Sequence, residues 1–128
     1  MKGAIVLSDD AELVASFAER LRQLGVEHTL GAGELHVHEA TTGLGFYFSA
    51  MPPGSEIAYR EPPHFPEPGV PMPDLAVVHG YGADCRSETF FAQMVAEISR
   101  SSTCPAWVLD ENSVVWDARH VDPERVRL

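Results

Sequence analysis

Proline is concentrated in one interval of this 128-residue chain, where eight of the ten prolines lie between positions 52 and 73. A proline has no backbone N–H group, so it cannot donate the hydrogen bond that a central strand requires. The interval therefore predicts a long extended loop that covers part of the surface or presents a binding edge. Within it, residues 57–59 are predicted as a short edge strand. The loop separates two halves, each with the pattern of a strand, a helix and a hairpin.

The first half predicts one strand, one helix and a meander. Residues 4–7 are an apolar run typical of a strand. Apolar residues at helical spacing follow in residues 13–24, and Gly25 supplies the expected C-terminal stop. Asp9 and Glu12 resemble a capping box ahead of this helix. Alternating apolar and polar residues then predict an antiparallel meander built from residues 26–30, 34–40 and 44–50.

The second half predicts a buried strand, a turn and a helix in close succession. Residues 75–78 are a short apolar run, which indicates a central strand covered on both faces. Gly80 and Gly82 are expected to turn the chain sharply after that strand. Ser87 is a candidate N-cap for the helix that follows. The buried face of this helix is predicted from apolar residues at offsets of about 0, 3, 4 and 7, namely Phe91, Met94, Val95 and Ile98.

The C-terminal part predicts a hairpin and a tail that returns to the core. Residues 106–109 and 114–116 flank the polar turn 110–113. In the tail, Val121, Val126 and Leu128 are expected to pack back onto the domain. The inward residues of the hairpin are predicted to be Trp107, Leu109, Val114 and Trp116.

These elements together predict a single α+β domain over residues 1–128. The expected architecture is a mainly antiparallel sheet with two amphipathic helices packed on one face. A chain of this length can bury a core of its own, so the fold requires neither a metal nor a disulfide. No apolar run reaches the roughly 20 residues of a membrane span. Residues 1–8 lack a signal-peptide pattern, so the expectation is a cytoplasmic protein without a membrane partner.

The charge balance is strongly acidic, with 19 Asp and Glu against 9 Lys and Arg and a formal net charge of −10. Between Gln23 and Cys85, Arg60 is the only basic side chain besides histidine. Such a field repels phosphate backbones and accelerates association with a basic protein. The charge therefore argues against nucleic-acid binding and favours a basic protein partner. Acidity that only keeps the protein soluble is the alternative.

Two histidines raise the question of a metal site. His36 and His38 are expected to project from the same face of a strand, a spacing found in some zinc sites, with a third ligand from His28, His64 or His79. A zinc site needs three or four converging ligands. Solvent-facing strand residues are therefore the favoured interpretation, and no metal or cofactor is assigned.

A second hypothesis is a small enzyme or ligand-binding domain at the predicted turn from His79 to Cys85. Cys85 lies near the expected start of a helix, where the helix dipole can lower a thiol pKa, and His79 precedes it. A structural cysteine is the favoured alternative, and no catalytic residue is assigned.

A third hypothesis is a peptide-binding module. Gly43-Leu44-Gly45-Phe46 resembles the loop with which PDZ domains bind a peptide carboxylate, and it precedes a predicted strand. The order of elements differs from that family, because a strand and a long helix precede the motif.

The C-terminal part of the chain contains Phe90-Phe91, Pro105-Ala106-Trp107-Val108-Leu109-Asp110, Val114-Val115-Trp116-Asp117 and residues 121–128. Together these segments resemble the ending of small bacterial proteins of the polymorphic-toxin immunity type. The resemblance implies a cytoplasmic α+β inhibitor that neutralises a toxin by surface binding, without catalytic residues.

The acidity agrees with that resemblance, because an inhibitor of a basic toxin benefits from electrostatic steering. The candidate partner-binding residues lie in the proline-rich loop and at the hairpin tip, where solvated loop charges are the alternative interpretation. They are Glu56, Glu61, Glu67, Asp110 and Glu111.

Overall fold

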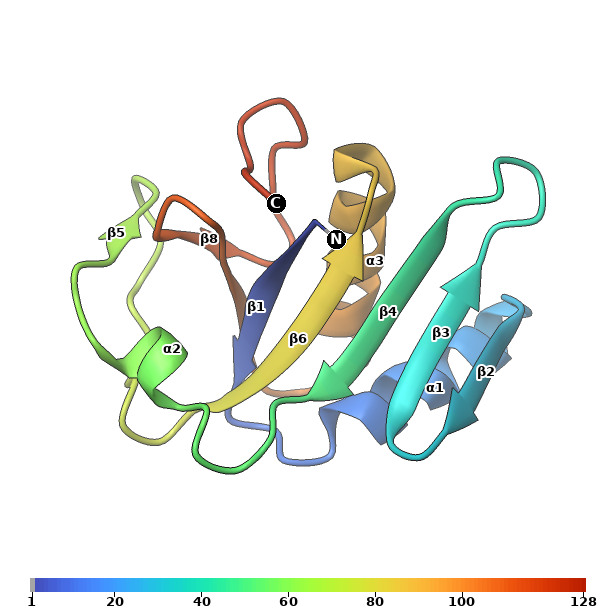
Figure 1. The fold of residues 1–128 in the computed structure, drawn as a ribbon, viewed down its shortest axis with the longest axis horizontal. Helices are drawn as coiled ribbons and strands as arrows, with labels where there is room; N and C mark the ends of the chain where they lie inside the picture. The colour runs from blue at the N-terminus through green and yellow to red at the C-terminus, as the bar shows by residue number, and fades with distance from the viewer. Residues whose placement is uncertain (1) are drawn as a thin grey trace.

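A computed structural model describes residues 2–128, which form one eight-stranded sheet and three helices (Figure 1). The strand order is β2-β3-β4-β6-β1-β7-β8-β5, and neighbouring strands in residues 2–128 are antiparallel except β5 and β8. The predicted mainly antiparallel α+β fold is confirmed. The strands are β1 (Gly3–Ser8), β2 (His28–Gly31), β3 (Glu34–His38), β4 (Gly45–Ala50), β5 (Phe65–Pro66), β6 (His79–Cys85), β7 (Ala106–Leu109) and β8 (Val114–Asp117).

The main core lies between the sheet and the two long helices, α1 (Leu13–Leu24) and α3 (Glu88–Arg100). In Figure 1 both helices lie behind the sheet. The ring of Phe17 from α1 meets Phe46 and Phe48 of β4 edge to face, with centroids 6.1 and 5.7 Å apart. Two helices on one face are therefore confirmed. The predicted inward face of α3 is also confirmed, since Phe91, Met94, Val95 and Ile98 are all buried.

A second, smaller core lies on the opposite face and is covered by the proline-rich segment. It contains Leu7, Tyr59, Val78, Trp107, Leu109 and Val115. Strands β1, β7 and β8 are therefore covered on both sides, which explains why every residue of β7 is buried. Strand β3 has one open face, so its apolar and polar residues alternate.

The proline-rich segment is held to the sheet by backbone and indole hydrogen bonds. Trp107 Nε1 donates to the Pro71 carbonyl at 2.9 Å, and the amides of Phe65 and Glu67 donate to the Ser113 and Val115 carbonyls at 2.8 and 2.9 Å. Pro66 lies between those two donors. On this edge strand its nitrogen has no neighbouring strand in residues 2–128 to donate to, so the missing N–H group costs no hydrogen bond. The segment therefore covers part of the sheet, but it is not extended throughout, because residues 57–60 form a helical turn and residues 65–66 form β5.

Residues 57–59 are not an edge strand, so that prediction was wrong. They belong to the one-turn helix α2 (Ile57–Arg60), which lies in front of the sheet in Figure 1. The amides of Tyr59 and Arg60 donate to the Glu56 carbonyl at 3.1 and 2.9 Å. This turn directs Tyr59 into the second core and leaves the Ile57 side chain exposed. Burial of a single large side chain therefore decides the conformation.

The predicted central strand at residues 75–78 was also wrong. These residues form a turn in which the amides of Val77 and Val78 bond to the Asp74 carbonyl. The central strand is β6, and it contains the two glycines that were predicted to turn the chain. A Cβ at Gly80 would overlap the ring of Tyr59, so a glycine is required where that ring lies on the sheet. Glycine destabilises a strand because it loses more conformational entropy on folding than other residues do. The hydrogen bonds of β6 with β1 on one side and with β4 on the other offset this loss.

The helix ends follow their local sequence with one exception. Gly25 adopts a left-handed conformation with φ of 70° after α1, as predicted. Ser87 caps α3, and its hydroxyl accepts a hydrogen bond from the Phe90 amide at 3.2 Å. The capping box of Asp9 and Glu12 was wrong, because the side chain of Glu12, at the N-cap, makes no capping hydrogen bond. The carboxylate of Asp10 instead accepts from the Glu12 amide at 2.8 Å.

The C-terminal hairpin of β7 and β8 is confirmed, but its buried residues face two cores. Trp107 and Leu109 lie in the second core, whereas Trp116 lies in the main core. Val126 returns to the main core as predicted, and Val121 and Leu128 pack partly against it. None of the helices in residues 2–128 combines the length and apolar character needed to cross a bilayer.

Candidate functional site

A hollow of about 640 Å³ lies on the face of the sheet opposite α1 and α3, between the sheet and the proline-rich segment. Its floor comes from β1 and β6 in the middle of the sheet, through Gly3, Ile5, Gly82 and Asp84. One wall is formed by residues 57–64, and the other by the end of β7 and the hairpin turn up to Ser113. Segments distant in sequence thus meet at one depression.

Asp84 is the central polar residue of this floor. It pairs with Gly3 of β1 on one side and with Tyr47 of β4 on the other. A Cβ at position 3 would overlap the Asp84 carboxylate, so Gly3 provides the space in which that group lies. A Cβ at Gly82 would meet no heavy atom within 4 Å, which shows that the adjoining floor is open. The two glycines leave the Asp84 carboxylate facing free space.

Carboxylate side chains line the hollow. Glu61 and Glu111 are exposed and Asp84 is half-buried. Within residues 2–128, none of these three forms an ion pair, and no Lys or Arg lines the hollow. By contrast, six of the nine Lys and Arg side chains pair with acidic residues elsewhere in residues 2–128. Three unpaired carboxylates thus lie around one depression whose described lining contains no Lys or Arg.

His64 forms part of the wall and has an unusual hydrogen-bond pattern. Its Nε2 lies 2.7 Å from the Tyr59 carbonyl oxygen, which can only accept a hydrogen bond. Nε2 therefore carries the proton and donates, and Nδ1 of the neutral ring is an acceptor. Within residues 2–128, Nδ1 is buried and has no hydrogen-bond partner.

The five predicted partner-binding residues do not form one surface. Glu61 and Glu111 line the hollow. Glu56 lines a smaller neighbouring hollow of about 190 Å³, where Arg60 is a close neighbour. Glu67 is neutralised by Arg125 at 2.5 Å.

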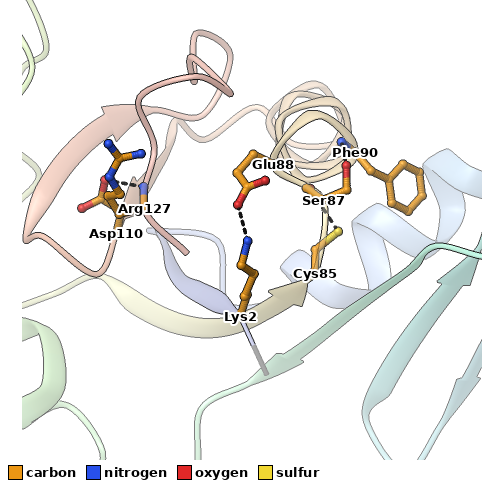
Figure 2. A network of polar contacts seen from close by, with 7 residues as sticks. All are labelled: Lys2, Cys85, Ser87, Glu88, Phe90, Asp110 and Arg127. Carbon is orange, nitrogen blue, oxygen red and sulfur yellow. Dashed lines mark hydrogen bonds and ion pairs between the residues drawn. The ribbon is translucent and has the colours of Figure 1, made fainter.

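Asp110 contributes to the interior instead of the surface. It is 6% exposed, and its carboxylate accepts hydrogen bonds from Trp116 Nε1 at 3.0 Å and from the Val114 amide at 3.0 Å. The backbone amides of Asn112 and Arg127 also donate to it, at 2.9 and 3.2 Å, and the Arg127 contact is drawn in Figure 2. Asp110 thus joins the hairpin turn to the C-terminal tail, and its charge is satisfied by the protein itself.

His79 and Cys85 do not form a site, because they are the first and last residues of β6. The six steps from residue 79 to residue 85, at about 3.3 Å per residue of a strand, place the two residues roughly 20 Å apart. The Cys85 thiol is buried and donates to the Ser87 carbonyl at 3.4 Å (Figure 2). Burial raises the pKa of this thiol above its ordinary value, which is the opposite of an activated nucleophile.

His36 and His38 share the open face of β3, with ring centroids 6.0 Å apart. His36 also stacks on Tyr47 at 4.2 Å. Within residues 2–128, no group of three or more His, Cys, Asp or Glu is arranged to hold a metal ion. The pair is thus part of an aromatic surface on the sheet.

Gly43 and Leu44 lie in the turn between β3 and β4, and Gly45 and Phe46 are the first residues of β4. The Gly43 amide donates to the Glu39 carbonyl at 2.8 Å, and the Leu44 amide donates to the Thr42 hydroxyl at 3.2 Å. A carboxylate-binding loop needs free amides. Two of the amides that would bind a peptide carboxylate are therefore already used.

Asp84 and Gly3 are the functional candidates that sequence reasoning missed. A glycine within a strand often marks close approach of another group, and Gly3 stands next to the first apolar strand. That signal identifies a crowded position, but it does not identify Asp84 as the neighbour. The pairing of β1 with β6 supplies this information.

No protein-family model, no curated protein and no solved structure matches this chain.

Proposed function

We propose that this protein is an inhibitor of the immunity type, which acts in the cytoplasm by binding a basic protein toxin. The contact surface in this proposal is the acidic hollow lined by Glu61, Asp84 and Glu111. One observation carries the proposal: three carboxylates without ion pairs surround a depression whose described lining contains no Lys or Arg. A surface of this kind is complementary to a basic partner and speeds encounter with it.

The way the hollow is built favours rigid docking. Its floor is the middle of an eight-stranded sheet, and its wall is tied down by the Trp107 and Phe65 hydrogen bonds. A preorganised surface loses little conformational entropy when a partner binds. The two other hypotheses receive no such support, because His79 lies far from Cys85 and the amides of Gly43 and Leu44 are occupied.

Growth rescue provides the first test. The product of the adjacent gene is expressed in a bacterial host alone and together with this protein. The proposal expects that product to be basic and to stop growth, and expects co-expression to restore growth. An adjacent product that is harmless, or one whose toxicity persists on co-expression, would contradict the proposal.

Charge variants provide the second test, with a matched control. The triple variant Glu61→Gln, Asp84→Asn, Glu111→Gln removes three carboxylates from the hollow. The control Asp9→Asn, Glu12→Gln, Glu27→Gln removes three exposed carboxylates near α1 and has the same net charge. We expect the hollow variant to bind the purified partner at least about tenfold more weakly, a change of about 1.4 kcal/mol, and the control to bind nearly as the wild type does.

Salt dependence separates steering from other contacts. The affinity of the wild-type protein for its partner is expected to fall steeply between about 50 and about 500 mM NaCl, because the salt screens the attraction between exposed charges. The hollow variant is expected to show a shallower dependence. Equal affinity of the hollow and control variants would remove the hollow from the proposal.

A further inference from the structure

We propose that the open edge of the sheet at β2 receives an extended, basic segment of a partner protein, which adds a strand antiparallel to β2. This inference goes beyond the proposed function, because β2 lies at the end of the sheet opposite the proline-rich segment and outside the hollow (Figure 1). The backbone groups, the side chains and the charges of this edge support it.

The turn between β2 and β3 fixes which backbone groups of β2 face outwards. Its loop has two residues, Ala32 and Gly33, with φ of 54° and 77°. Positive φ at both positions of a two-residue loop is the pattern of a type I′ hairpin turn. A hydrogen bond across such a turn joins the residues that flank it. Gly31 and Glu34 are therefore a hydrogen-bonded pair of the ladder.

Hydrogen-bonded pairs alternate along an antiparallel ladder. The backbone groups of Thr29 therefore also face β3, whereas those of His28 and Leu30 point away from it. On the other side of β3, the Glu39 amide donates to the Leu44 carbonyl at 2.9 Å, which agrees with this alternation. Among residues 2–128, β3 is the only strand paired with β2, and no turn or cap hydrogen bond uses the backbone of His28 or Leu30. Their N–H and C=O groups are available to an added strand.

The two edges of the sheet differ in how they are protected against further pairing. Natural edge strands are commonly blocked by proline, by lysine or by very short length. The edge strand β5 is two residues long and contains Pro66. The edge strand β2 contains no proline, Lys or Arg, and its last three residues are exposed. β2 is therefore the edge at which a strand can add.

The side chains of β2 favour an apolar face on the added strand. Leu30 pairs with Leu35 of the main core, so it lies on the helix-covered face of the sheet. It is nevertheless 51% exposed, because no strand of residues 2–128 lies on its outer side. Apolar side chains of an added strand on this face would remove Leu30 from water, which is favourable.

The charges around β2 favour a basic segment. Glu27 directly precedes β2, and Glu34 pairs with its last residue, so exposed carboxylates stand at both ends of the edge. Neither forms an ion pair in residues 2–128. Between Gln23 and Arg60 the sequence has no Lys or Arg. Basic side chains on an added strand would neutralise these carboxylates.

The same charges disfavour a second copy of this chain. Antiparallel pairing of two copies through the free groups of His28 and Leu30 places Glu27 of one copy opposite residue 31 of the other, beside Glu34. Like charges across neighbouring strands are destabilising, and each copy carries a net charge of −10. A basic partner has neither cost.

A peptide with alternating basic and apolar residues tests the inference. The probe is acetylated and amidated Lys-Val-Lys-Val-Lys-Val-Lys, titrated into the full-length protein at low salt and followed by ¹H–¹⁵N NMR. We expect the amide hydrogens of His28 and Leu30 to exchange at least about tenfold more slowly in the complex. Those of Thr29 and Gly31 already bond to β3 and should change little. A peptide with Glu in place of each Lys is expected not to bind.

N-methylation of the probe separates strand pairing from attraction by charge alone. Residues opposite one another in an antiparallel pair project to the same face. The valines therefore lie opposite His28 and Leu30, and their N–H groups face β2. Methylation of the valine nitrogens should weaken binding at least about tenfold. A peptide with the same number of methyl groups on lysine backbone nitrogens should bind nearly as the unmodified probe does.

A matched pair of lysine substitutions locates the contact on the protein. Leu30→Lys places a positive charge on the edge strand and is expected to weaken binding of the probe at least about tenfold. Leu24→Lys is the control, because Leu24 on α1 is 48% exposed and the change of charge is the same. This control is expected to bind nearly as the wild type does.

Several outcomes would overturn strand addition by a basic segment. They are equal binding of the two methylated peptides, unchanged exchange at His28 and Leu30, and equal affinity of the two lysine variants. A wild-type dimer in sedimentation that becomes a monomer in Leu30→Lys would assign the edge to a second copy instead. The proposed function fails separately, because growth rescue and the charge variants of the hollow do not involve β2.

Discussion

At the scale of single residues, Asp84 and Asp110 show how surroundings divide two aspartates between binding and structure. Both line the same hollow. Asp110 is buried and receives hydrogen bonds from the Trp116 indole and from several backbone amides. Asp84 is half-buried and lies beside open space over Gly82. The first carboxylate is occupied within the protein, whereas the second is available to a ligand.

Replacement of Asp110 by asparagine tests its structural role. In Asp110→Asn an NH₂ group takes the place of one carboxylate oxygen. This group cannot accept the hydrogen bonds that the indole and the backbone amides donate to the aspartate. We expect a loss of about 2 kcal/mol in the free energy of unfolding, since hydrogen bonds to a charged group contribute about 1.5–3 kcal/mol. Urea denaturation followed by tryptophan fluorescence measures this. The neighbouring exposed residue supplies the control, and Glu111→Gln is expected to stay within about 0.5 kcal/mol of the wild type.

The two cysteines are expected to differ in reactivity. Cys85 is buried and its pKa is raised by burial, whereas Cys104 is partly exposed. The thiolate is the reactive form, so Cys85 should react slowly in the folded protein at neutral pH. A chromogenic disulfide reagent should therefore modify one thiol quickly and the second only after denaturation. In Cys104→Ser the fast phase should disappear, and a persistent fast phase would mean that Cys85 is accessible.

At the scale of elements, β6 is the strand on which both cores depend. Tyr81, Ala83 and Cys85 face the helices, and Gly80 lies under the Tyr59 ring on the opposite side. The two glycines thus serve different purposes. Gly80 permits the contact with α2, whereas Gly82 leaves the floor of the hollow open.

A matched pair of alanine substitutions in β6 tests this difference. Gly80→Ala places a methyl group against Tyr59 and is expected to cost about 1–3 kcal/mol of stability, which is typical of overpacking. Gly82→Ala has free space and removes the flexibility of a strand glycine, so it is expected to be neutral or stabilising by up to about 1 kcal/mol. Chemical denaturation of the two variants gives the comparison. Similar destabilisation in both would show that Tyr59 does not make position 80 special.

At the scale of the whole molecule, stability should fall at both ends of the pH range. A hydrogen bond from the Ser102 hydroxyl is the main cause that lowers the pKa of Asp10 below its ordinary value of 3.8. This contribution is present above that value and is lost as the pH falls through the lowered pKa. Burial raises the pKa values of Tyr81 and Cys85 above their ordinary values of 10.0 and 9.0. Their contributions are present below those values and decline as the pH rises towards the raised pKa values.

The alkaline decline can be assigned by substitution. In Tyr81→Phe the phenol that ionises in the unfolded state is gone, so the slope of stability against pH above about 9 should be smaller than in the wild type. Ser102→Ala should reduce the stability difference between about pH 5 and about pH 3, because Asp10 then loses its main hydrogen bond. Unfolding free energies measured across the pH range provide both slopes. An unchanged alkaline slope in Tyr81→Phe would exclude Tyr81 as a contributor.

Charge distribution is the other property of the whole molecule. In α1 and α3, Arg20, Arg22 and Arg100 pair with Glu19 and Glu97, so the helical side carries much of the internal compensation. The hollow on the opposite face has no such pairs among residues 2–128. Unpaired carboxylates of this acidic chain therefore line the sheet where it is open.

The sequence by itself determined the elements whose causes are local. The Ser87 cap, the buried stripe of α3, the Gly25 stop and the alternation in β3 each depend on residues within a few positions of one another. It also determined the acidity of the chain, which is a property of composition.

Only the tertiary structure decided which face of each strand is covered and which carboxylates are available. The apolar residues 75–78 suited a strand as well as a turn, and Tyr59 lying on Gly80 placed the strand later in the chain. Asp84 lies in the hollow because β1 and β6 pair with Gly3 opposite it. Contacts of this kind join residues that are distant in sequence, so neither periodicity nor local hydrogen bonding encodes them.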